Sequence, residues 1–147
     1  MEEPKKYHLH SLEETQKFAA SLAKKLPTGT IVALIGNLGS GKTTFTQGFA
    51  KGLGVKDAIG SPTFKLVSQY DGENSVLYHI DCYRLKNSSD FLNIGGEMYL
   101  IPEDGYTLIE WADIIEDILP EEALRLQFDR IPGKSEERMI AIMGHSL

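Results

Sequence analysis

The sequence predicts an α/β fold: a single domain whose mixed central sheet carries antiparallel hairpins and is flanked by helices. Three observations predict this class. Short apolar runs alternate with helical patterns, a glycine-rich loop joins a buried-type strand to a helix, and pairs of strands are separated by turn residues. The 147 residues have the length of one domain, so we assign residues 1–147 to it and expect residues 1–8 to be a flexible N-terminal segment.

The first third of the chain predicts a helix, a strand and a second helix. The helix over 12–26 begins at a capping box, with Ser11 as N-cap and Glu14 reaching back to it. The continuous apolar run Thr30–Ile35 predicts a strand that is buried on both faces, as in a parallel sheet. After the glycine-rich loop, residues 44–53 have the pattern of a helix.

The rest of the chain predicts strands with two interruptions. A turn at 71–74 separates two strands that should form a hairpin, and residues 87–105 are ambiguous between a short helix and loops. The predicted elements are strands at 64–70 and 76–81, a strand at 106–110, a helix at 112–119, and strands at 123–129 and 138–143 joined by a polar loop at 130–137.

Composition and charge exclude several classes of protein. The 41% hydrophobic and 24% charged residues are typical of a folded globular chain. We expect a cytoplasmic protein without membrane association, because no apolar run reaches the roughly 18 residues of a membrane span and the N-terminus lacks a signal-like stretch. The net charge of −6, from 15 basic and 21 acidic residues, argues against autonomous binding of nucleic acid.

Residues 36–44 match the phosphate-loop pattern G-x-x-x-x-G-K-[ST], and chance would produce such a match in only about 0.5% of chains of this length. Backbone N–H groups of such a loop and of the following helix bind phosphate oxygens. The lysine reaches the β- and γ-phosphates, and the following hydroxyl binds Mg²⁺. We therefore expect a P-loop NTPase-type domain that binds ATP and Mg²⁺. The candidate loop residues are Asn37, Leu38, Gly39, Ser40, Gly41, Lys42, Thr43 and Thr44.

Two acidic residues end apolar strands and are candidates for the chemistry of hydrolysis. Asp81 closes the strand at 76–81 and Glu110 closes the strand at 106–110. Hydrolysis needs a carboxylate for the metal and a group that positions water. Ligands bind at the carboxyl ends of parallel strands, so both acids can face the nucleotide. Which of them contacts the metal does not follow from their spacing.

Other residues leave alternatives open. The segment 61–64 is either a loop that senses the γ-phosphate or a proline-fixed start of a strand. Trp111 is either a core residue or an anchor for a partner protein. The histidines have no metal-ligand spacing to Cys82, so we expect no structural metal, and His79 is interpreted as a packed or surface histidine.

Four of these segments together resemble the TsaE family, formerly YjeE, over about residues 9–144. They are the phosphate loop at 36–44, Ser61-Pro62-Thr63-Phe64, His79-Ile80-Asp81-Cys82-Tyr83-Arg84-Leu85 and Leu108-Ile109-Glu110-Trp111. The resemblance implies a slow bacterial ATPase of the tRNA threonylcarbamoyladenosine pathway. It also implies partnership with TsaD and TsaB, which modify adenosine 37 of ANN-decoding tRNAs, and ATP hydrolysis that resets the complex between turnovers.

The resemblance also implies roles for individual residues. Lys42 would hold phosphate, and Thr43 and Glu110 would hold Mg²⁺. Asp81 would lie near the attacking water or the metal shell, so the catalytic set is Lys42, Asp81 and Glu110.

Further roles in nucleotide binding come from the same resemblance. Thr63 would belong to a switch-like loop, and Ser11 and Arg138 would contact the adenine. The chain departs from the family at Asn37, where Asp is frequent, and at 88–97, which replaces a more acidic, leucine-rich stretch.

Two other functions compete with this interpretation. A small-molecule kinase would need an acceptor pocket and usually an arginine-rich lid, but the arginines here are scattered. A nucleotide-gated adaptor would need no turnover, and the two strand-end acids argue against it. Phosphate release from ATP alone, compared with transfer to an added acceptor, discriminates between the ATPase and the kinase.

Overall fold

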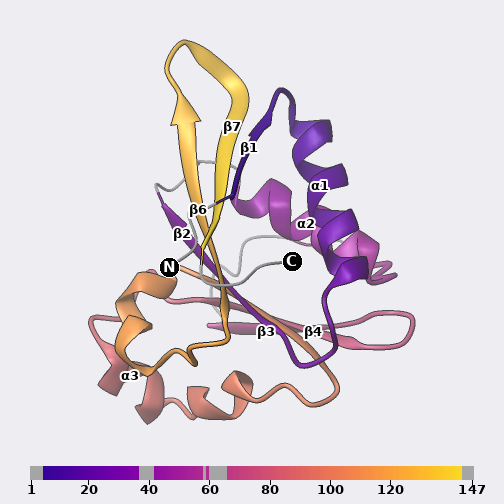
Figure 1. The fold of residues 1–147 in the computed structure, drawn as a ribbon. Helices are drawn as coiled ribbons and strands as arrows, with labels where there is room; N and C mark the ends of the chain where they lie inside the picture. The colour runs from indigo at the N-terminus through magenta and orange to yellow at the C-terminus, as the bar shows by residue number, and fades with distance from the viewer. Residues whose placement is uncertain (1–4, 37–41, 58, 60–65, 144–147) are drawn as a thin grey trace.

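The computed structural model describes residues 5–36, 42–57, 59 and 66–143. Within these ranges the chain forms a mixed sheet with helices on both faces (Figure 1). In chain order the elements are β1 (Lys5–Leu9), α1 (Leu12–Lys25), β2 (Ile31–Gly36), α2 (Lys42–Gly52), β3 (Val67–Asp71), β4 (Val76–Asp81), α3 (Ser88–Asn93), the 3₁₀ helix η1 (Gly96–Leu100), β5 (Gly105–Glu110), the 3₁₀ helix η2 (Ala112–Ile118), β6 (Leu124–Ile131) and β7 (Lys134–Met143).

The sheet has a parallel centre and antiparallel margins, as the predicted fold class requires. Its strand order is β1-β7-β6-β2-β5-β4-β3. β2 runs parallel to both β5 and β6, and β4 runs parallel to β5. The β3–β4 hairpin closes one margin, while β7 and then β1 add antiparallel strands at the other. The four parallel strands therefore end at a single edge of the sheet.

The two faces of the sheet are covered by different helices. α1 and α2 pack on one face over a core that includes Leu34, Phe49 and Leu108. α3 and η2 pack on the other face, where Phe91 and Ile115 are fully buried. Successive side chains of a strand point to opposite faces, so the central strands are apolar on both sides, as the run at 30–35 predicted.

Helices α1 and α2 pack at very close range because glycines line the contact. A Cβ atom at Gly48 would lie 2.3 Å from the carbonyl oxygen of Gln16, and one at Gly52 would lie 2.6 Å from that of Ala20. On its sheet side α2 presents Phe45, whose ring meets that of Phe128 edge-on at 5.4 Å between centroids. The position of α2 is therefore determined by backbone contact on one side and aromatic packing on the other.

The expectation of a flexible segment over residues 1–8 is wrong for residues 5–8, while residues 1–4 lie outside the described residues. Lys5–Leu9 form β1, which pairs antiparallel with β7. Tyr7 and Leu9 pack against the core beneath α1, and this burial favours an ordered strand. The alternation of apolar residues at 7 and 9 was the available signal, and it is too short to stand out.

Three other local predictions differ from the structure. The predicted polar loop at 130–137 is mostly strand, because β6 and β7 continue to a tight turn in which Gly133 has φ of +78°. The helix at 112–119 is a 3₁₀ helix. Ser11 caps α1 as predicted, but Glu14 accepts the N–H of His10 instead of that of Ser11.

Cys82 follows β4 and is completely buried, next to Asp81. Burial raises the pKa of its thiol to about 12, with smaller contributions from the charges of Asp81 and Asp113. The thiolate is the reactive form, so at about pH 8 we expect iodoacetamide to leave the native protein unmodified and to alkylate it in denaturing guanidinium chloride. Mass spectrometry gives a direct readout, since the chain has one cysteine. Alkylation of the native protein at the rate of the unfolded chain would contradict the burial.

Candidate nucleotide-binding site

Gly36, the first residue of the phosphate-loop pattern, lies at the edge where the parallel strands end. β2 ends at Gly36, which pairs with Phe128 of β6. Gly36 has φ of +131°, and a Cβ atom there would lie 2.3 Å from the carbonyl oxygen of Phe128. Only glycine fits this close approach. The sequence then continues to Lys42, where α2 begins on the face that α1 also covers.

Asp81 and Glu110 lie side by side at this edge. They are register partners at the carboxyl ends of β4 and β5, and Glu110 is also the partner of Leu34 on β2. Leu34 belongs to the core under α1 and α2. Because register partners on parallel strands point to the same face, both acids point to the face on which α2 begins.

The two acids differ in their surroundings. Glu110 is buried, whereas Asp81 is partly buried and accepts the backbone N–H of Tyr83 through Oδ1 at 2.9 Å. The structure thus brings the two predicted acids together but gives each its own hydrogen-bond partner. Such partners matter because a metal ion needs ligand oxygens that other groups hold in place.

Glu110 is held by a histidine. The Nε2 atom of His79 lies 2.5 Å from Oε2 of Glu110, and the two side chains are only 1% and 7% exposed. Nδ1 of His79 has no hydrogen-bond partner among the described residues. The proton therefore belongs on Nε2, which donates to the carboxylate. The bond orients Glu110 through Oε2 and leaves Oε1 as the oxygen that could contact a metal ion.

Sequence reasoning placed His79 as a packed or surface residue, and it is packed, but its contact with Glu110 was missed. The two residues are 31 positions apart. The available signal was the alternation of His79 and Asp81 on one strand, which places both on the face that carries Glu110.

Trp111 directly follows Glu110 and has an unusual backbone. Among the described non-glycine residues it alone has a positive φ, at +58°. Such a conformation costs roughly 1–3 kcal/mol and persists where surrounding packing imposes it. The indole packs against the second core and lies 5.2 Å from the ring of Tyr83, which is exposed. Trp111 is thus a partly buried residue at the rim of the site.

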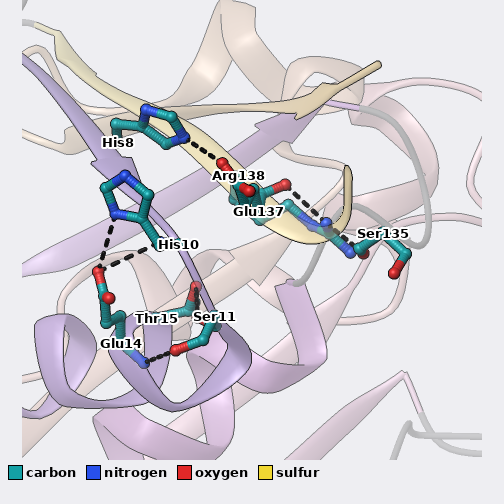
Figure 2. A network of polar contacts seen from close by, with 8 residues as sticks. All are labelled: His8, His10, Ser11, Glu14, Thr15, Ser135, Glu137 and Arg138. Carbon is teal, nitrogen blue, oxygen red and sulfur yellow. Dashed lines mark hydrogen bonds and ion pairs between the residues drawn. The ribbon is translucent and has the colours of Figure 1, made fainter. Parts of the chain in front are cut away.

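Ser11 and Arg138 both lie near the end of β1, on the other margin of the sheet (Figure 2). On β7, Arg138 is the register partner of Leu9 of β1 and of Arg130 of β6. Arg130 follows Phe128 by two residues toward the carboxyl end of β6. It is buried, and its Nη1 donates to the carbonyl oxygens of Ser135 and Glu137 at 2.8 Å. Burial and then the charge of Arg130 lower its pKa.

Of the predicted phosphate-loop residues 37–44, the structure describes the side chains of Thr43 and Thr44. Thr43 and Thr44 are partly buried in the first turn of α2. The side chain of Lys42 lies outside the described residues, as do Asn37, Leu38, Gly39, Ser40, Gly41 and Thr63.

A pocket at the opposite edge of the sheet is separate from this site. It is lined by residues 26–31, 100–103 and 122–124, near the amino ends of β2 and β6. The candidate acids and the start of α2 lie at the carboxyl ends. We therefore assign no nucleotide-binding role to this pocket.

The fold and this edge define a P-loop NTPase-type domain: a mixed sheet with parallel central strands, in which β2 leads through a glycine-rich segment into a helix and acids end two further strands. None of the helices within the described ranges is long and apolar enough to cross a membrane.

Comparison with known proteins identifies the family. The TsaE family, described as "Threonylcarbamoyl adenosine biosynthesis protein TsaE", matches residues 9–140. The TsaE proteins of Bacillus subtilis and Treponema pallidum are 38% and 34% identical to this chain, over 90% and 89% of it and 82% and 96% of their own lengths. The crystal structure of YdiB from Bacillus subtilis superposes with a TM-score of 0.73 at 35% identity, covering 97% of this chain and 86% of YdiB.

The chain therefore belongs to the TsaE family of tRNA threonylcarbamoyladenosine biosynthesis proteins. This confirms the resemblance that the four sequence segments indicated.

Proposed function

We propose that this protein is an ATPase that binds and slowly hydrolyses Mg-ATP, and so supports repeated rounds of threonylcarbamoylation at adenosine 37 of tRNA. The observation that carries the proposal is the pairing of Asp81 with Glu110 beside the end of β2, on the face where α2 begins. A protein that only binds nucleotide needs no second acid at this position.

The residues at this edge suit a magnesium ion. Mg²⁺ prefers oxygen ligands and usually takes one or two from carboxylates. The hydroxyl of Thr43 and the carboxylate of Glu110 would hold it, and the ion would neutralise charge on the phosphates. Lys42 would hold the β- and γ-phosphates. Asp81, which is partly buried and held by the N–H of Tyr83, would orient the attacking water.

TsaD and TsaB are the partners in this proposal. The chain is small and its net charge is −6, so the tRNA would be held chiefly by the partners, whereas this protein would act through its association with them. Tyr83 is 59% exposed beside Trp111 at the rim of the site. This aromatic pair would let the nucleotide state influence a docked protein.

The test is tRNA modification by the assembled TsaB–TsaD complex with Lys42→Ala protein. Loss of the lysine should abolish ATP binding, so we expect modification to stop after about one round. Lys51→Ala is the matched control, because Lys51 is an exposed lysine on the same helix. It should support many rounds. Unimpaired repeated modification with Lys42→Ala protein would contradict the proposal.

Association is tested separately by pull-down from bacterial lysate. We expect the tagged wild-type protein to recover TsaD and TsaB to an extent that depends on added ATP. Recovery of neither partner, with or without ATP, would remove these two proteins from the proposal while leaving the ATPase assignment to the turnover test.

A further inference from the structure

Two histidines and a glutamate gather on the β1 margin, away from the paired acids Asp81 and Glu110. His8 lies in β1 and His10 directly follows the strand, and their stacked rings lie on the same side. Glu137 on β7 reaches the same face diagonally. One nitrogen of each histidine and one oxygen of Glu137 all lie within 4.8 Å of one another (Figure 2).

The contacts within this cluster hold the rings close. His8 Nε2 lies 2.7 Å from Oε1 of Glu137, and the two imidazole rings are stacked with centroids 4.2 Å apart. His8 and His10 are exposed and Glu137 is partly buried. The cluster therefore has solvent on one side, from which an ion can enter and from which water can complete its coordination.

We propose that His8, His10 and Glu137 form a binding site for a divalent transition-metal ion of the Zn²⁺ type. Two imidazole nitrogens and one carboxylate oxygen are a common zinc ligand set, with water in the fourth position. Bonds of about 2.0–2.1 Å place tetrahedral ligands roughly 3.4 Å apart. His8 Nε2 and Glu137 Oε1, now 2.7 Å apart, would separate to this spacing, and the stacked imidazole rings would turn so that a nitrogen of each faces the ion.

A further residue orients one of the ligands. Oε1 of Glu14 lies 3.3 Å from Nδ1 of His10 and also accepts the backbone N–H of His10. These two hydrogen bonds, first that of the backbone, lower the pKa of Glu14. A histidine that donates one ring N–H to a carboxylate presents its other nitrogen to a metal. Nε2 of His10 is then the atom that binds the ion.

The position of the site gives it a role in the fold. A metal ion there would join β1 to β7 next to the N-cap Ser11 and the buried Arg138. β1 is an edge strand of five residues that pairs with β7 on one side, and an ion that binds the folded chain stabilises that chain by mass action. The ion would tie the first strand to the corner that carries both candidate adenine contacts.

The test is titration of the full chain with ZnCl₂, followed by calorimetry and by thermal unfolding, in excess Mg²⁺ so that sites made of oxygen ligands are saturated. We expect one Zn²⁺ per chain and a rise in melting temperature with added Zn²⁺. His8→Asn and His10→Asn should each weaken binding at least about tenfold. Circular dichroism confirms that the variants are folded.

The control variant is Lys6→Asn, which changes an exposed residue of the same strand and the same face but removes no ligand. It should bind Zn²⁺ like the wild type. The double variant His8→Asn/His10→Asn decides the matter. If it binds Zn²⁺ as tightly as the wild type, the ion sits elsewhere and the proposal is overturned; loss of one equivalent of binding supports it.

Discussion

Glu110→Gln should reduce Mg²⁺-dependent ATP hydrolysis by more than the roughly 10–100-fold that is typical for residues that only support a metal ligand. The amide keeps an oxygen that can accept the Nε2–H of His79, so the buried pair remains hydrogen-bonded. It lacks the negative charge that a magnesium ligand supplies. The measurement is phosphate release across a range of Mg²⁺ concentrations, in the presence of the partner proteins.

The companion variant His79→Gln separates positioning from direct ligation. It keeps the carboxylate but replaces the ring that orients it at 2.5 Å. We expect a roughly 10–100-fold increase in the Mg²⁺ concentration needed for half-maximal activity, with recovery at saturating Mg²⁺. A purely structural role for His79 would lower the melting temperature without moving this midpoint. Full tRNA modification by Glu110→Gln protein that still binds ATP but no longer hydrolyses it would instead favour the nucleotide-gated adaptor.

Gly48→Ala should lower the free energy of unfolding by about 3 kcal/mol, although helix propensity alone predicts a gain of about 1 kcal/mol. The added methyl group would lie 2.3 Å from the carbonyl oxygen and 2.6 Å from the Cα atom of Gln16. Both are backbone atoms of α1, so no side-chain rotation relieves the clash and the helices must separate. For a chain of this size the melting temperature should fall by about 6–12 °C.

A second consequence of Gly48→Ala concerns ATP. α2 begins with Lys42, and its displacement would move the start of the helix relative to the ends of β4 and β5. We therefore expect weaker ATP binding in the folded variant at low temperature. Lys51→Ala, at an exposed position of the same helix, should change stability by less than about 0.5 kcal/mol. A rise in melting temperature for Gly48→Ala would show that propensity outweighs packing here.

The elements of this fold were predictable where their patterns are long and local. The capping residue Ser11 marks the start of α1, and the apolar run 30–35 coincides with β2 to within one residue at each end. The corrections fall where tertiary contacts outweigh local composition. Polar residues at 134–137 belong to β7 because the hairpin with β6 continues to the turn at Gly133, where Lys134 is the register partner of Ile131.

In the candidate site, too, some features follow from local sequence patterns and others only from tertiary contacts. The phosphate-loop pattern and the strand-end positions of Asp81 and Glu110 are local properties of the sequence, and strand ends lie at predictable edges of a parallel sheet. Their register pairing is a property of the sheet. The bond between His79 and Glu110 joins neighbouring strands, and strand order cannot be read from spacing along the chain.

For this protein the amino-acid sequence determined the fold class, the family and the residue types that suit Mg-ATP, because these depend on periodicity and on motifs of a few consecutive residues. Tertiary structure decided which groups meet. It placed His79 against Glu110, Gly48 against the backbone of α1, and His8 and His10 beside Glu137. Each of these contacts joins residues that are distant in the chain. They meet only because of the register of the sheet and the packing of the helices.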